Sequence, residues 1–128
     1  MRQKQVYHPN LLENKILITI EYLNSLGFYP NSFGVYKILK GEVDEEIKPF
    51  INCPTFRVII SIPKKKISLR INMLLRHDFL NNKYSINDDM MVLEISTKGK
   101  QFLKEYYKNR KIDFTKKKQK SQKTIIKL

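Results

Sequence analysis

Apolar residues recur at helical spacing in the first third of the chain. Asn10 precedes this stripe, and Glu13 comes three residues after Asn10. That spacing is typical of a capping box at a helix start. Gly27 stands where a glycine often ends a helix. The pattern therefore predicts an amphipathic helix from about residue 11 to residue 26. Its apolar positions, at intervals of four, four, three and three, are Leu12, Ile16, Ile20, Leu23 and Leu26.

A second, shorter helix is expected after the break at Phe28-Tyr29-Pro30. Either Asn31 or Ser32 can cap it, and Gly41 can end it. Residues 42–51 are acidic and contain a proline, so they are predicted to form a turn or a single helical turn. The apolar positions of the short helix are Phe33, Tyr36, Ile38 and Leu39.

The segment FRVIISI, residues 56–62, fits two kinds of element. It is short, β-branched and bounded by prolines, which suits a buried strand, but a short helix remains the alternative. The next segment, residues 63–76, predicts a helix with two distinct faces. Its apolar stripe is Ile67, Ile71, Leu74 and Leu75, and the opposite side carries Lys65, Leu69, Asn72 and Arg76.

Residues 79–86 and 90–95 read as two strands joined by the turn Asn87-Asp88-Asp89, which predicts a β-hairpin. Thr97 can cap a last helix from residue 98 to about residue 110. The inner face of that helix would carry Phe102, Leu103 and Tyr106.

The fold class expected from this order is mainly α with a small β-hairpin. A helix–turn–helix followed directly by a two-stranded hairpin is typical of a winged helix, here with extra N-terminal helices. That order favours a helix over residues 56–61, as the first helix of the pair.

Charge adds a strong indication of the partner. The chain has 128 residues, with 25 Lys+Arg against 12 Asp+Glu and a net charge of +13. Such an excess indicates a polyanion, with nucleic acid as the first candidate and an anionic membrane as the second. We expect one folded domain over residues 1–111 and a basic, disordered tail over 112–128. Either the tail raises affinity for nucleic acid without sequence preference, or it is only a solvated run.

Several classes of protein are not expected. No apolar run reaches the length of a membrane helix, and the basic N-terminus is followed by no uninterrupted apolar stretch of a signal peptide. A single cysteine, Cys53, suits a reducing cytoplasm. We find no nucleophile–base arrangement and no metal-ligand spacing, and the acidic clusters 44–46 and 88–89 are expected in solvated turns. The prediction is a cytoplasmic protein without enzyme activity, cofactor or small-molecule substrate.

Three segments carry a resemblance to a known family. They are GVYKILKG at residues 34–41, CPTFRVIISIPKKKISLRINMLLRHDFL at 53–80 and MMVLEISTKGKQFL at 90–103. Together they resemble the RQC domain, the winged helix that follows the ATPase core of RecQ helicases. The resemblance spans roughly residues 11–107, and small stand-alone bacterial proteins carry just such a domain.

The chain also departs from that family. The ATPase lobes and the four-cysteine zinc module are missing, so helicase activity is not implied. RQC domains often place an aromatic side chain at the wing tip, which wedges open a duplex end. The tip here is Asn87-Asp88-Asp89, and the nearest aromatic residue is Tyr84.

The candidate DNA-binding residues fall into three groups. Lys64, Lys65 and Lys66 start a helix, where free N–H groups and the helix dipole favour phosphate, and the resemblance implies the same role for the whole stretch 63–68. The second group consists of outward residues of this helix and one residue that precedes it. The third group lies on the wing. These additional residues are Ser68, Leu69 and Asn72, with Arg57 before the helix, and Lys83 and Tyr84 on the wing.

Two of these assignments have alternatives. Asn72 could read adenine in the major groove, although RQC domains generally recognise DNA shape and duplex ends. Tyr84 could stack on an exposed base pair, or alternate with Ile86 and pack on the core. The predicted function is a DNA-binding module that grips duplex DNA mainly through phosphates, with ends and junctions as candidate targets. A sequence-specific winged-helix transcription regulator and a protein-docking winged helix are the alternatives.

Overall fold

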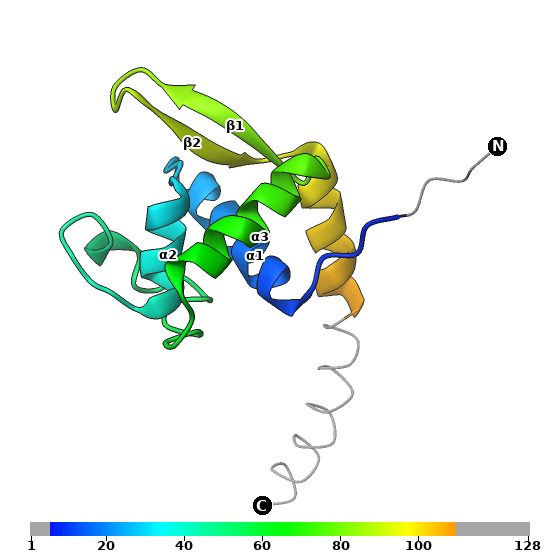
Figure 1. Cartoon of the computed structure of the whole chain (residues 1–128), viewed down its shortest axis with the longest axis horizontal. Helices are drawn as coiled ribbons and strands as arrows, with labels where there is room; N and C mark the ends of the chain where they lie inside the picture. Colours follow the sequence, from blue (N-terminus) through cyan, green and yellow to red (C-terminus); the bar gives the residue numbers. More distant parts are fainter. Residues whose placement is uncertain (1–5, 110–128) are drawn as a thin grey trace, which may run out of the picture.

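The computed structural model describes residues 6–109 and shows a mainly helical fold with a small β-hairpin, which confirms the expected class at that level. Figure 1 shows α3 crossing in front of α1 and the hairpin projecting past the helices. The last helix is unlabelled there, and its described part covers residues 97–109. The other elements are α1 (Leu11–Ser25), α2 (Ser32–Lys40), the short 3-10 helix η1 (Lys48–Phe50), α3 (Lys64–Arg76), β1 (Leu80–Ser85) and β2 (Met90–Ile95).

The ends of α1 and α2 follow the sequence signals. Asn10 caps α1 in a capping box with Glu13, and Gly27 adopts φ +83° just after it. The Asn31 side chain accepts a hydrogen bond from the Gly34 N–H at 2.8 Å and so caps α2. Gly41 ends that helix with φ +86°, a left-handed conformation that favours glycine.

The main core lies where α1, α2, α3, the hairpin base and the last helix meet. Most of the expected stripe of α1 is buried, although Leu12 is half-buried and Leu26 is exposed. Leu103 contributes from the last helix as predicted. The buried members of this core include Ile16, Leu17, Ile20, Val35, Leu39, Ile67, Ile71, Leu74, Leu80, Leu93, Ile95 and Leu103.

The hairpin is tied to the helices by polar contacts at the open edge of β2. The Leu93 N–H donates to the carbonyl of Pro30, between α1 and α2, at 2.7 Å. The Asn24 side chain on α1 accepts from the Ile95 N–H at 2.8 Å. These bonds satisfy edge groups of β2 that no strand pairs, and they fix the direction in which the hairpin leaves the body.

The segment 56–61 is neither a helix nor a strand, so the expected helix there was wrong. Its N–H groups bond instead to the end of α2: Arg57 donates to Ile38 at 2.8 Å and Ile59 donates to Leu39 at 2.9 Å. The last carbonyls of a helix have no partner within the helix, and this segment supplies one. Arg57 adopts φ +62°, outside the helical range. The helix that precedes α3 and packs on it is α2, joined to it by residues 41–63.

A second, smaller core holds that connection against α1 and α2. Ile47 and Cys53 are buried with Leu23 and Ile38. The acidic cluster 44–46 lies in a turn, as expected, but it is also a partner for a lysine. The buried Lys37 ammonium lies 2.7 Å from an Asp44 carboxylate oxygen and 2.9 Å from one of Glu46.

The last helix begins one residue earlier than predicted. The cap is Ser96 rather than Thr97, because the Ser96 hydroxyl oxygen accepts a hydrogen bond from the Gly99 N–H at 2.9 Å. The same hydroxyl donates to the carbonyl of Asp78 at 2.6 Å. Ser96 thus joins the helix start to the chain that precedes β1.

Candidate nucleic-acid interface

Helix α3 presents one apolar and one polar face. Ile67, Ile71 and Leu74 are buried as the spacing predicted, and Leu75 is half-buried. The thirteen residues of α3 contain five basic side chains and no acidic one. Because no carboxylate interrupts its outer side, α3 offers a continuous surface for a polyanion.

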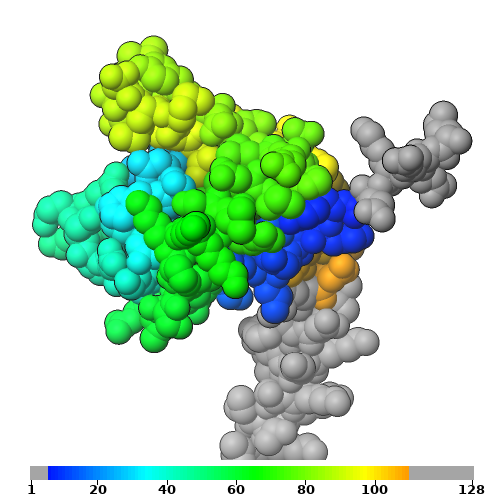
Figure 2. Space-filling view, viewed as in Figure 1, coloured from blue at the N-terminus to red at the C-terminus, as the bar shows by residue number. Residues whose placement is uncertain are grey.

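The outward face of α3 carries the side chains that the sequence placed there. Lys65, Leu69, Asn72 and Arg76 are exposed, and Leu69 retains 52 % of its surface. Ser68, between the two faces, is half-buried. Figure 2 shows α3, in green, at the front of the molecule with the hairpin standing clear above it.

The first turn of α3 combines free backbone donors with three ammonium groups. Pro63 occupies the N-cap position, and no side chain in the described part of the chain caps this helix. Lys64, Lys65 and Lys66 are all exposed. Lys64 also contacts α2, because its Nζ atom lies 4.3 Å from the centre of the Phe33 ring. Phosphate is favoured at such a turn by both the N–H groups and the charges.

On the hairpin, Tyr84 does not pack on the core. It is 53 % exposed and Ile86 is 83 % exposed, so the alternative in which both residues belong to the core was wrong. Tyr84 pairs across the hairpin with Met91. Leu80 and Leu93 lie on the same face of the hairpin, but closer to the helices. Its hydroxyl donates to a carboxylate oxygen of Asp89, and this hydrogen bond raises the pKa of Tyr84.

Lys83 faces the other side of the hairpin, because neighbouring strand residues point to opposite faces. Its Nζ atom lies 3.9 Å from a carboxylate oxygen of Glu94 and 4.3 Å from the centre of the Tyr29 ring. The hairpin therefore separates Lys83 from Tyr84, and a ligand on the Tyr84 face would not meet the Lys83 ammonium in this conformation.

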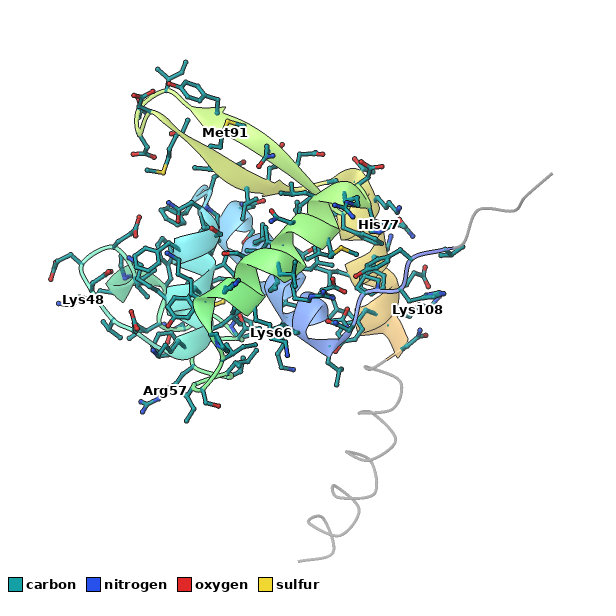
Figure 3. The ribbon with its side chains drawn as sticks, viewed as in Figure 1. Lys48, Arg57, Lys66, His77, Met91 and Lys108 are labelled. Carbon is teal, nitrogen blue, oxygen red and sulfur yellow. The ribbon has the colours of Figure 1, made fainter. Side chains whose placement is uncertain are left out.

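Arg57 also stands apart from the face of α3. It lies in the irregular connection, exposed, with its side-chain carbons over Gly41. Figure 3 shows it pointing outward below the N-terminal end of α3, whereas Lys66 lies on the helix itself. The structure thus brings together the six candidates from Lys64 to Asn72 on α3, places Tyr84 separately on the projecting hairpin, and leaves Arg57 and Lys83 outside.

Two exposed side chains on the hairpin were not predicted as candidates. Met90 and Met91 are 41 % and 51 % exposed on the outer part of β2, and Figure 3 shows Met91 on the projecting hairpin. Two consecutive apolar residues in a strand point to opposite faces, so only one of them could have been buried if the hairpin had a single covered face. That pattern was the available signal for an exposed apolar end.

Other features of the described residues 6–109 add no chemistry to this face. No group of three or more His, Cys, Asp or Glu side chains there could hold a metal ion. Within the same range, no helix has both the length and the apolar character needed to cross a bilayer. The basic tail predicted at 112–128 lies outside the described residues.

Comparisons with known proteins found no match, either among models of protein families or among curated sequences.

Proposed function

We propose that this chain is a winged-helix module that binds duplex DNA mainly through phosphates. The observation that carries the proposal is the outer face of α3, where exposed lysines and an exposed asparagine occur without a carboxylate. The excess of 25 basic over 12 acidic residues in the whole chain supports a polyanionic partner.

The arrangement of elements supports the winged-helix assignment. Helix α3 packs on α2 and is followed directly by the β1–β2 hairpin, the order of a helix–turn–helix with a wing. The connection between α2 and α3, residues 41–63, is longer than an ordinary turn. Its N–H groups bond to the end of α2, so the two helices remain packed despite that length.

In this mode α3 is the helix that approaches the DNA. The major groove, about 12 Å wide, admits an α-helix. Lys64, Lys65 and Lys66 would meet phosphates at the first turn, while Leu69 and Asn72 would face the base edges. Phosphate contacts then dominate the affinity, because a single outward asparagine supplies little base discrimination.

The hairpin favours duplex ends as a target within this proposal. An exposed tyrosine next to an exposed methionine offers a surface on which a terminal base pair can rest. The resemblance to RQC domains also suggests that a duplex end would contact the hairpin. The carboxylates of Asp88 and Asp89 at the tip would repel phosphates, which argues for contact with an end rather than separation of the strands.

The test is a salt titration of DNA binding with a charge-reversed α3. We expect the double variant Lys64→Glu/Lys65→Glu to bind weaker to every duplex sequence and to lower the salt slope by about 0.9 per lost phosphate contact. The matched control is Lys100→Glu/Lys104→Glu, which makes the same charge change at exposed positions of the last helix. An equal effect of both variants would show that only net charge matters, and an unchanged slope in the α3 variant would remove α3 from the interface.

A further inference from the structure

The outward side of α2 carries a second surface, which we call the aromatic ledge: Phe33, Tyr36, Lys40 and Lys64. The Phe33 and Tyr36 rings lie 6.2 Å apart between centroids, with only 17° between their planes. The Lys40 ammonium lies 3.0 Å from the Tyr36 hydroxyl, and that of Lys64 lies 4.3 Å from the centre of the Phe33 ring. Two nearly parallel rings thus lie between Lys64 and Lys40, and the ammonium of Lys37 also lies 4.8 Å from the centre of the Phe33 ring.

The ledge lies at the margin of the main core, against which Tyr36 packs. The buried stripe of α2 consists of Val35, Ile38 and Leu39, whereas Phe33 is 43 % exposed and Tyr36 is half-buried. An aromatic side chain at the surface loses the gain of burial that its large apolar area could provide. The Phe33 ring and the exposed part of Tyr36 are therefore placed where a ligand can reach them.

The chemistry of the ledge suits an unpaired strand of nucleic acid. Bases stack on aromatic side chains without regard to sequence, and phosphates pair with nearby ammonium groups. The separation of 6.2 Å between the rings exceeds the step of about 3.4 Å between stacked bases in a duplex strand. Successive bases could use both rings only in an extended strand, so the ledge does not fit the stacked strand of an intact duplex.

Lys64 connects the ledge to the proposed duplex site, because it belongs both to the first turn of α3 and to the ledge. A strand held by that turn could continue along α2. At the Tyr36 end, Lys40 lies 3.4 Å from a carboxylate oxygen of Glu42. At the Phe33 end, the carboxylates of Asp44 and Glu46 bind the Lys37 ammonium, which lies 4.8 Å from the centre of the Phe33 ring. These acids set a limit to the surface, so the ledge has room for few nucleotides.

We propose that the aromatic ledge binds the first unpaired nucleotides of a strand that leaves the duplex held on α3. The inference rests on the proposed duplex binding and makes its substrate more specific: a duplex with a single-stranded extension. An acidic protein segment would also meet the lysines, but it has no flat bases to stack on the two nearly parallel rings.

The experiment compares a blunt duplex with the same duplex carrying a short thymidine overhang, using the full chain. We expect the wild type to prefer the overhang. Phe33→Leu, which keeps an apolar side chain but removes the ring, should lower overhang affinity by about five-fold or more, the loss of one stacked base, and leave blunt binding unchanged. Phe33→Trp should retain the preference. The matched control is Tyr107→Leu, at a residue of similar exposure, 41 %, on the last helix.

Each other outcome overturns a definite part of the argument. Equal wild-type binding of both DNAs, or equal overhang affinity in Phe33→Leu and the wild type, would overturn the ledge while leaving duplex binding intact. A parallel loss on both DNAs in Phe33→Leu would also overturn it. If no duplex binds, the proposed function fails. In that case the ledge remains supported only under three conditions. The wild type must bind a thymidine oligonucleotide, Phe33→Leu must bind it more weakly, and polyglutamate must not displace it.

Discussion

The ammonium of Lys37 is buried on α2, 2.7 Å from a carboxylate oxygen of Asp44 in the connection that follows the helix. Burial alone would lower the pKa of Lys37, but the hydrogen bonds that its ammonium donates to Asp44 and Glu46, together with their negative charges, outweigh burial and raise that pKa. The hydrogen bond with Lys37 in turn lowers the pKa of Asp44, assisted by the Ile47 N–H. The pair joins α2 to the connection that leads to α3.

This pair predicts a pH dependence of stability. The Asp44 carboxyl has a lower pKa in the folded than in the unfolded protein, so its contribution is present above the unfolded pKa of about 3.9 and is lost as pH falls through the folded value. Asp44→Asn should lower the urea midpoint at pH 7, and the difference from wild type should shrink as the pH approaches about 2. Glu45→Gln, at the exposed neighbouring position, is the control. A difference that stays constant with pH would contradict the role of the ionised carboxylate.

The corrected start of the last helix gives a second prediction. Ser96→Ala removes both the cap to Gly99 and the bond to Asp78, and should lower the free energy of unfolding by about 1 kcal/mol. Thr97→Ala, one residue later at an exposed position, should change it by less than about 0.5 kcal/mol. Urea unfolding of the two variants decides between the two residues. The reverse order of effects would identify Thr97 as the cap.

The hairpin gives a third prediction, on the form of DNA that is bound. If Tyr84 stacks on a terminal base pair, Tyr84→Ala should weaken binding to linear duplex by about five-fold or more and leave binding to a closed circle unchanged. Tyr84→Phe keeps the ring and removes only the hydrogen bond to Asp89, so it should behave as the wild type. A competition assay with linear and circular DNA of equal length measures both variants. Wild-type behaviour of Tyr84→Ala on both forms would exclude the hairpin from end recognition.

Local signals predicted most of the elements because the interactions that form them are local. The Asn10–Glu13 capping box and the glycines at 27 and 41 lie within a few residues of the helix ends that they set. The alternation and turn residues of 79–95 specify a hairpin whose strands are neighbours in sequence. The lysines and Asn72 could be placed on the outside of α3 because its apolar stripe already occupied the other side.

The candidate site was harder to predict where partners are distant in sequence. Lys83 and Tyr84 are adjacent, yet one meets Glu94 and Tyr29 and the other points to the opposite side of the hairpin. Phe33 looked like an ordinary apolar position of a short helix. Its spacing of three from Tyr36, away from Val35, Ile38 and Leu39, was the only indication that it lies on another face.

The sequence by itself determined the helices α1, α2 and α3, the hairpin and the excess of positive charge, since caps, apolar spacing and composition need no distant partner. Only the tertiary structure decided the conformation of residues 56–61. Their sequence suits either regular element, but the carbonyls of Ile38 and Leu39 at the end of α2 accept their N–H groups and hold them as an irregular connection. It also decided that Lys64 lies against Phe33, because only the packing of α3 on α2 brings together two residues that are 31 positions apart.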